Sequence, residues 1–199
     1  MTPAQHFRKR AFDLAASALG LLALGLPLLA LALLARRSTG ASGFFVQERV
    51  GRGGRLVPIV KLRTMRPTSN GSTVTTAGDP RITRFGAFLR RTKLDELPQL
   101  WCVLRGHMSF VGPRPDVPGY ADRLQGDDRR ILELRPGITG PATLAFRDEE
   151  ELLAAQPDPQ RYNDEVLWPA KVRLNREYLD HWTLRGDLAS IWQTLFGKP

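Results

Sequence analysis

An uncharged run over residues 14–35 constrains the fold of this chain more than any other feature. The run consists mostly of Leu and Ala. At about 1.5 Å per residue, a helix over it would be roughly 30 Å long, which matches the hydrocarbon core of a bilayer. A cleaved signal peptide fits poorly, because Arg36 and Arg37 follow where a small polar cleavage region would be expected. We therefore predict that the run is a membrane anchor.

Two features argue against a simple spanning helix. Gly25 and Pro27 lie near the middle of the run, and Pro27 lacks an N–H for the carbonyl one turn earlier. Basic residues flank both ends, at 8–10 and 36–37, whereas a spanning helix normally has its basic excess on one side. If both flanks stay in the cytoplasm, the run must enter the membrane and return. Proline is tolerated in spanning helices, so these residues alone leave both topologies open.

The charge balance points to a polyanionic partner. The 199 residues are enough for one compact domain plus an anchor, and 29 Lys and Arg stand against 20 Asp and Glu, a net charge of +9. Such an excess suits nucleic acid, an anionic membrane surface or phosphorylated substrates. Cys102 is the only cysteine, and its apolar neighbours predict a packed side chain rather than a reactive thiol. No Cys and His set has the spacing of a zinc site.

A β-hairpin is predicted after the anchor. Residues 44–50 and 56–65 have strand patterns, and the glycine-rich stretch 51–54 between them is a turn signal. That stretch lacks the Walker pattern of a phosphate-binding loop, so we interpret it as the hairpin turn. Residues 67–80, rich in Thr, Ser, Gly and Pro, are expected to form a loop over the site. The apolar residues at 85–89 favour equally a core helix and a helix at the membrane interface.

Further helices are expected in the second half of the chain. Residues 116–134 have the mixed charge of a solvated helix. A repeat of apolar residues every four positions between 166 and 182 predicts a helix with one packed face. The segment 187–196 carries Trp192 and Phe196, and its composition suits a membrane surface.

The strongest chemical pattern lies around an Asp-Glu pair. Asp95 and Glu96 are adjacent, with cations before them and the guanidinium of the stiff turn Gly112–Pro115 after them. Apolar residues at helical spacing between 94 and 104 predict a helix that begins at about Asp95, so that Pro98 falls in its first turn. The two acids could serve only as a helix N-cap and a first-turn acid. Their cationic surroundings instead favour a nucleophilic carboxylate acting on a phosphate, because cations absorb the charge on the phosphoryl oxygens.

These stretches are similar to a known family. Leu-Asp-Glu-Leu-Pro-Gln-Leu at 94–100 and Met-Ser-Phe-Val-Gly-Pro-Arg-Pro at 108–115 resemble the bacterial sugar transferases, the monotopic phosphoglycosyl transferases. Further matches occur in the family's order and cover nearly the whole chain: Lys9–Asp13, Gln47–Gly51, Lys61–Met65 and Arg135–Gly140. This set is far more specific than a lone Asp-Glu pair. Because 199 residues leave no room for the extra N-terminal membrane region of larger members, we expect the small form of the family.

The resemblance implies an architecture as well as a location. Members are described by a broken re-entrant helix that dips into one leaflet. We therefore expect an α+β, mostly helical protein, with a re-entrant helix-break-helix anchor over residues 1–40 that breaks at Gly25 and Pro27. A compact cytoplasmic catalytic domain is expected over residues 41–199, with a small β-hairpin and interfacial amphipathic helices. The expected location is the cytoplasmic face of the bacterial inner membrane.

The resemblance also implies a reaction. Family members transfer a phosphosugar from a UDP-sugar to a membrane polyprenyl phosphate such as undecaprenyl phosphate, the first membrane step of surface glycan assembly. Carried onto this sequence, Asp95 is the nucleophile that forms a covalent phosphosugar intermediate, and Glu96 holds the cofactor Mg²⁺. Adjacent helical residues point about 100° apart, which suits separate tasks for the two carboxylates. The cations around the substrate phosphates are Lys61, Arg90, Arg114 and Arg147. A homodimer is left open.

Some positions depart from the family pattern. Cys102 stands where Asn is usual, and His107 stands where Asp is usual. Pro141–Thr143 follows the Pro-Gly-Ile-Thr-Gly motif, where many members have an apolar residue, Ala and Gln. Contacts with the sugar are expected to differ accordingly, and the sequence does not name the sugar.

Two functions of other classes are alternatives to the enzyme. A membrane-tethered nucleic-acid-binding protein would explain the net charge of +9. It would want aromatic residues interleaved with the basic ones as stacking platforms, yet most aromatic residues here lie among Leu, Val and Ala, so we expect no nucleic-acid partner. A scaffold anchor without chemistry would tolerate the loss of Asp95.

Overall fold

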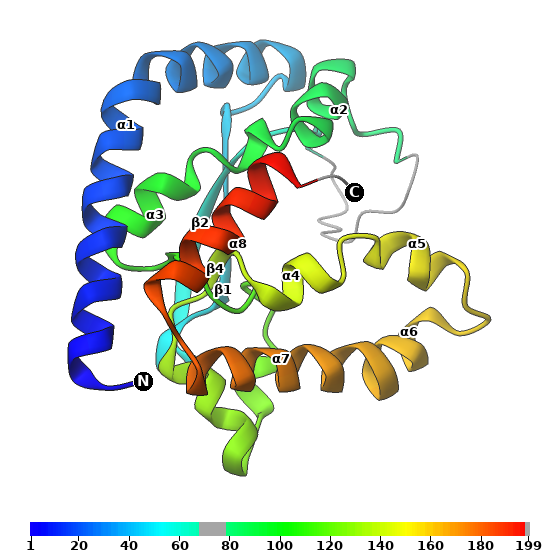
Figure 1. Cartoon of the computed structure of the whole chain (residues 1–199). Coiled ribbons are helices and arrows are strands. Elements are labelled where there is room, and N and C mark those ends of the chain that lie inside the picture. The colour runs from blue at the N-terminus through cyan, green and yellow to red at the C-terminus, as the bar shows by residue number, and fades with distance from the viewer. Residues whose placement is uncertain (68–78, 198–199) are drawn as a thin grey trace.

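The computed structural model describes residues 1–67 and 79–197, except for the side chain of Glu150. Within that part the chain is mostly helical, with two small two-stranded sheets (Figure 1). The α-helices are α1 (Pro3–Thr39), α2 (Arg84–Arg91), α3 (Gln99–Arg105), α4 (Pro141–Ala145), α5 (Glu149–Ala154), α6 (Pro159–Tyr162), α7 (Trp168–Asp180) and α8 (Leu184–Phe196). The strands are β1 (Phe44–Val50), β2 (Leu56–Leu62), β3 (Ser109–Val111) and β4 (Gly137–Thr139).

Short turns of other helix types join these elements. They are the 3₁₀ turns η1 (Arg52–Gly54), η2 (Leu94–Glu96), η3 (Ala121–Arg123) and η4 (Gly126–Glu133) and the π-helical turn η5 (Asn163–Leu167). The predicted mostly helical fold with a small hairpin is confirmed. The loop predicted at 67–80 falls almost entirely on residues 68–78, outside the described residues.

The predicted anchor is part of α1, a single helix from Pro3 to Thr39. It begins at a capping box on Thr2 and ends at Gly40 in the left-handed conformation. By length and composition it could cross a membrane. Figure 1 shows that α1 bends, so that its two arms run in different directions. Pro27 lies inside the helix, where a missing backbone hydrogen bond permits such a bend. The expected helix-break-helix is therefore a bend within one continuous helix.

The first arm of α1 is attached to the rest of the chain by buried polar contacts. Lys9 Nζ lies 2.7 Å from Asp187 Oδ2 of α8, and both side chains are buried. Buried Asp13 accepts hydrogen bonds from Ser109 Oγ at 3.0 Å and from the Phe110 N–H at 3.1 Å. Leaving a buried charge without its partner costs about 3–5 kcal/mol, so these contacts fix the register of this arm.

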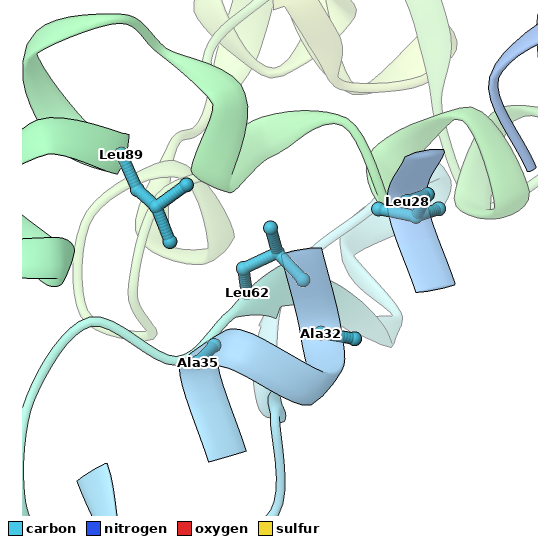
Figure 2. Packing of buried hydrophobic residues seen from close by; sticks show 5 residues of the cluster. All are labelled: Leu28, Ala32, Ala35, Leu62 and Leu89. Atoms are coloured by element: carbon cyan, nitrogen blue, oxygen red, sulfur yellow. The ribbon is translucent and has the colours of Figure 1, made fainter. Parts of the chain in front are cut away.

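The second arm of α1 packs on the same body through apolar contacts. Leu28, Ala32 and Ala35 form a buried cluster with Leu62 of β2 and Leu89 of α2 (Figure 2). Burial of a leucine side chain is worth about 1.5–3 kcal/mol, so the cluster holds this arm firmly on the hairpin and α2. Both ends of α1 therefore contact one globular body.

The opposite face of α1 is exposed in the described part of the structure. Leu22 is 84% exposed and Leu26 is 82% exposed, both just before Pro27. Further large apolar side chains along the helix are also exposed: Leu19, Leu29, Leu33 and Leu34. An apolar face of this extent is typical of a surface that contacts lipid or another protein.

The predicted hairpin is confirmed as the antiparallel pair β1 and β2. Its register runs from Phe44 opposite Leu62 to Val50 opposite Leu56, and η1 closes the turn. β2 ends at Leu62 rather than at Met65, which pairs instead with Ile82 in an isolated bridge. Burial of Cys102 against the hairpin raises the pKa of its thiol, so the prediction of a packed cysteine is confirmed.

A second sheet holds the turn that carries Arg114. β3 and β4 are parallel, and the Gly112 N–H donates to the Thr139 carbonyl at 2.9 Å. A Cβ at Gly137 or Gly140 would collide with the backbone of Gly112, so only glycine permits this approach. The turn at 112–115 is thereby clamped to β4.

The prediction of one helix over 116–134 is wrong, whereas the helix predicted between 166 and 182 is confirmed as α7 with a different buried face. Residues 116–134 form the separate turns η3 and η4 rather than one helix, and Gly126, the first residue of η4, has a positive φ of 54°. The buried face of α7 is at Val172, Asn175 and Leu179, not at the predicted four-residue repeat. Four residues turn a helix through about 400°, so a strict repeat of four winds away from any one face.

The predicted C-terminal helix is confirmed, and so is the core packing considered for α2. α8 begins at Leu184, a little before the predicted start, and Trp192 and Phe196 on it are mostly exposed. On α2, Leu89 is fully buried in the cluster with α1, whereas Phe88 is 41% exposed.

Candidate functional site

The Asp-Glu pair lies in a tight turn between α2 and α3. Lys93, shortly after the end of α2, adopts the left-handed conformation with φ 57°, so the chain cannot continue as a helix there. Residues 94–96 form the 3₁₀ turn η2, and α3 begins only at Gln99, after Pro98 as its N-cap. The predicted helix start at about Asp95 is therefore wrong. Pro98 has no N–H to give to the preceding turn, so the local bonds run to residues three positions back.

Asp95 carries a buried carboxylate oxygen without a partner. Its Oδ1 is shielded from solvent and has no hydrogen-bond partner among the described residues. Burial raises the pKa of the Asp95 carboxyl, and the charge of Glu96 raises it further, against the opposing charges of Lys61, Arg90 and Lys93. A shielded carboxylate with an unused oxygen, surrounded by cations, suits covalent attack on a phosphate.

Glu96 has a contrasting environment. Burial alone would raise the pKa of its carboxyl, but Lys61, hydrogen-bonded to it at 2.8 Å, and the charges of Arg114 and Lys93 outweigh burial. The pKa of Glu96 is therefore held below its usual range. Adjacent acids with opposite shifts suit different chemical tasks, which agrees with the separate roles predicted for them.

Two of the predicted cations lie on the α2 side of the pair. Lys61 on β2 contacts Glu96 directly. Arg90, at the end of α2, donates to Thr64 Oγ1 at 2.9 Å and contacts Met65 Sδ at 3.0 Å, and its charge lowers the pKa of Asp95. The hydrogen bond to Thr64 fixes the guanidinium beside the pair.

The other two predicted cations lie in different places. Arg114, on the clamped turn after β3, lines a pocket together with Lys61 and Glu96. Arg147 donates instead to the carbonyls of Gln193 and Gly197 at the end of α8, where a cation offsets the helix dipole. The structure thus brings Lys61, Arg90 and Arg114 around the acids, whereas Arg147 does not line this pocket.

The pocket opens beside Glu96 on one face of the hairpin. It includes about 440 Å³ of space between atoms, part of it open to solvent. The hairpin contributes Phe45, Gln47, Arg49, Ile59 and Lys61 to its wall, and the remainder comes from Glu96, Gln99, Arg114, Pro115, Gly137 and Ile138. An elongated polar ligand could therefore contact the hairpin and the Asp-Glu turn together.

The sequence predicted no role in the site for Gln47, Arg49 or Asp116. Gln47 and Arg49 were part of a family motif, and their alternation along β1 could have indicated a shared face with Lys61 across the hairpin. Asp116 follows the Arg114 turn, and burial raises the pKa of its carboxyl to about 6 although Lys171, Arg114 and Arg49 act to lower it. No local pattern in the sequence signals that burial.

The acids fit a metal ion shared with a substrate rather than a closed metal cage. Within residues 1–67 and 79–197, no group of three or more His, Cys, Asp or Glu side chains is arranged to hold a metal. Mg²⁺ is commonly held by one or two carboxylates together with substrate phosphates and water. Glu96 at the pocket wall and the unsatisfied Oδ1 of the adjacent Asp95 offer oxygen ligands of this kind.

Comparison with known proteins gives a consistent set of relatives. A family model described as bacterial sugar transferase matches residues 4–197. The UDP-glucose:undecaprenyl-phosphate glucose-1-phosphate transferase of Escherichia coli is 34% identical over 198 residues, covering 94% of this chain and 39% of that protein. The protein of the same name in Caulobacter vibrioides is 38% identical over 202 residues, covering 94% of this chain and 68% of that protein.

A third relative has a different sugar in its name. The UDP-galactose-lipid carrier transferase of Erwinia amylovora is 32% identical over 206 residues, which cover 95% of this chain and 40% of that protein. The chain thus spans about two fifths of the length of the Erwinia and Escherichia relatives.

Replacing Asp116 tests whether the pKa of its carboxyl is raised beside the pocket. A carboxyl with a folded-state pKa of about 6 favours folding below its ordinary pKa of 3.8, and that contribution is lost as pH rises through 6. We expect Asp116→Asn to raise the free energy of unfolding by about 1–2 kcal/mol at pH 7.5, after allowance for solvent screening, and by much less at pH 4. Urea denaturation at both pH values measures this.

The matched control is Asp127→Asn, which removes a largely exposed carboxylate. Its effect should be small at both pH values. An Asp116→Asn effect of equal size at pH 4 and pH 7.5 would contradict the raised pKa.

Proposed function

The chain belongs to the bacterial sugar transferase family, and we propose that it transfers a sugar phosphate from a UDP-sugar to a membrane polyprenyl phosphate. The observation that carries the proposal is the Asp95–Glu96 pair, two adjacent acids with opposite pKa shifts among three cations. The names of the relatives support the substrates, since they include UDP-glucose and undecaprenyl phosphate. Such a reaction is a membrane step in the synthesis of surface polysaccharides.

In the first step, a carboxylate oxygen of Asp95 attacks the phosphorus that bears the sugar. A bond forms between that oxygen and the phosphorus, and the bond from the phosphorus to the bridging oxygen of the diphosphate breaks. The bridging oxygen keeps the electron pair and departs as part of uridine monophosphate, which leaves the phosphosugar on Asp95. Lys61, Arg90 and Arg114 offset the charge on the phosphoryl oxygens during this exchange.

In the second step, an oxygen of the polyprenyl phosphate attacks the same phosphorus. The bond between the phosphorus and Asp95 breaks, and its electron pair returns to the carboxylate. The product is a polyprenyl diphosphate sugar, and the enzyme returns to its starting state. Because neither step requires a proton to be moved, a separate general base is unnecessary.

We assign the cofactor as Mg²⁺, with Glu96 as its protein ligand. The lowered pKa of the Glu96 carboxyl supports this role, because a metal ligand must be ionised. When bound, Mg²⁺ would neutralise part of the charge on the diphosphate. Lys61 holds the Glu96 carboxylate at 2.8 Å and thereby orients it toward the pocket that both residues line.

The anchor is proposed to be re-entrant, with both of its ends in the cytoplasm. The first arm of α1 is attached to α8 through Lys9 and Asp187, and the second arm packs on β2 and α2. A helix that crossed the bilayer would carry one end to the far side, away from the body that both arms contact. The bend near Pro27 and the exposed leucines on either side of it suit a helix that dips into one leaflet.

Exposed aromatic residues suit an interfacial position for the catalytic domain. Phe88 on α2, Trp101 on α3 and Trp192 and Phe196 on α8 are all substantially exposed. Such side chains favour the boundary between headgroups and acyl chains. We therefore locate the domain at the cytoplasmic face of the bacterial inner membrane, where soluble UDP-sugars are accessible.

Replacing the nucleophile tests the covalent mechanism. We expect Asp95→Asn to lower turnover about a thousandfold or more and to abolish a phosphosugar adduct on peptides containing residue 95. The fold should be retained, because the change removes a buried charge. Transfer from radiolabelled UDP-glucose and UDP-galactose to polyprenyl phosphate measures activity, with Asp127→Asn as the control. Normal turnover in Asp95→Asn would exclude this nucleophile and favour a scaffold.

The metal assignment predicts a shift in magnesium dependence. Glu96→Gln replaces a carboxylate by an amide, a poorer ligand for a hard cation. We expect this variant to need at least tenfold more Mg²⁺ for half-maximal activity. A magnesium titration identical to that of the wild type would remove Glu96 from the metal site.

Straightening α1 tests the topology. Replacing Gly25 and Pro27 by leucine favours a straight helix by roughly 1 and 3 kcal/mol respectively, although the N-terminal basic cluster opposes its crossing. We expect a mixed topology and lower activity for this variant, and a single topology for the native anchor. A cysteine at Thr2, in a Cys102→Ser background, is probed with an impermeant thiol reagent on intact spheroplasts. Strong labelling of the native anchor from outside would show a spanning helix instead.

A further inference from the structure

One face of β1 extends the pocket away from the Asp-Glu pair. Phe45, Gln47 and Arg49 alternate along the strand, and the first two lie opposite Lys61 and Ile59 of β2. Successive residues of one face are separated by about 7 Å. Gln47 thus stands one step beyond Lys61 along the pocket, and Arg49 stands two steps beyond it.

The guanidinium of Arg49 is turned back toward this pocket. Its Nε and Nη2 both donate to Gln47 Oε1, at 3.0 and 2.6 Å, and its Nη1 lies 3.5 Å from the Pro115 carbonyl. The charged group therefore lies at the level of Gln47, about 7 Å along the strand from the Lys61 pair. With its Oε1 occupied, the amide of Gln47 can offer only its NH₂ donors to a ligand.

Arg49 and Arg114 form a positive pair that makes no direct ion pair among the described residues, although the charge of Asp116 acts on Arg49 and both arginines act on Asp116. In the described part of the chain, no carboxylate lies within 4 Å of either guanidinium, and both line the pocket. Burial lowers the pKa of Arg49, and the charge of Arg114 lowers it further. Arg49 is half-buried and Arg114 is exposed, and burial raises the pKa of the neighbouring Asp116 to about 6, so a bound anion would relieve the repulsion between the two guanidinium groups. This arrangement is typical of a phosphate site, because arginine forks match phosphate oxygens.

We propose that Arg49, together with Arg114, binds the phosphate that departs with the nucleoside. This inference rests on the proposed function. Lys61, beside Glu96, then contacts the phosphate that bears the sugar, and Arg49 contacts its neighbour in the same diphosphate. When the bridging bond breaks, the departing phosphate gains one negative charge, which the two guanidinium groups stabilise.

The lipid phosphate is the other possible source of a phosphate, and the position of Arg49 disfavours it. The Phe44 end of the hairpin packs with the cluster of α1, whereas Val50, next to Arg49, packs with Ile131 and Val172. Arg49, next to Val50, therefore lies at the end of the hairpin remote from the second arm of α1. Figure 1 shows β1 running away from that arm. A water-soluble nucleotide reaches that end more readily than a phosphate anchored in the bilayer.

The test compares binding of uridine monophosphate and uridine to the full chain in nanodiscs by titration calorimetry. Arg49→Gln should weaken uridine monophosphate binding about tenfold to a hundredfold, the range for a lost hydrogen bond to a charged group, and should leave uridine binding nearly unchanged. Gln47→Glu should weaken it similarly without loss of thermal stability, because the new carboxylate would neutralise Arg49. Arg55→Gln, which removes an exposed arginine of the same hairpin, is the control and should bind as the wild type does.

A second titration uses a short-chain polyprenyl phosphate in the same nanodiscs. Its affinity should be the same in the wild type and in Arg49→Gln, and an equal loss for both phosphates would overturn the nucleotide assignment. If the wild type binds uridine monophosphate and Arg49→Gln binds it as tightly, the role of Arg49 is wrong while the proposed function stands. If the wild type binds no uridine monophosphate, the inference and the proposed function both fail.

Discussion

The attachment of both arms of α1 to one globular body is the constraint on which the rest of the structure depends. One arm is held by a buried ion pair between Lys9 and Asp187, and the other by apolar packing of Ala32 and Ala35 against Leu62. The two attachments differ in kind: the ion pair is directional and fixes register, whereas the apolar cluster supplies most of the binding free energy. Because β2 and α2 belong to the second attachment, the anchor positions the two elements that carry Lys61 and Arg90.

The candidate site combines two opposing electrostatic effects. Burial works against ionised carboxyl groups, and the surrounding cations work for them. For Glu96 the cations win, because Lys61 bonds to it directly. For Asp95 burial wins, because its Oδ1 has no partner among the described residues and its adjacent acid adds repulsion. Two adjacent carboxyl groups thus have opposite pKa shifts within a single dipeptide.

Features governed by local chemistry were predictable from the sequence. The glycine-rich turn at 51–54 defined the hairpin, and the apolar neighbours of Cys102 indicated its burial. The start of α3 was misplaced because the left-handed Lys93 carries no sequence signal, since such a conformation in lysine depends on tertiary contacts. The pairing of Lys9 with Asp187 and the grouping of Arg49 with Arg114 join distant parts of the chain, and no periodicity within one segment can reveal them. Roles assigned by family resemblance to Asp95 and Arg147 stay predictions.

Gly43 and Gly86 allow close backbone contacts around the anchor, and these contacts affect how its neighbours move. A Cβ at Gly43 would collide with the carbonyl of Ala32, and one at Gly86 would collide with the carbonyl of Thr64. These backbone contacts, together with the close-packed cluster of Leu62, Leu89 and the α1 side chains, couple the anchor, the hairpin and α2 closely. The three elements therefore move together. Under the proposed topology, the distance of Asp95 from the bilayer would be fixed by how deeply the second arm of α1 lies in it, and a lipid phosphate would have to reach Asp95 at that distance.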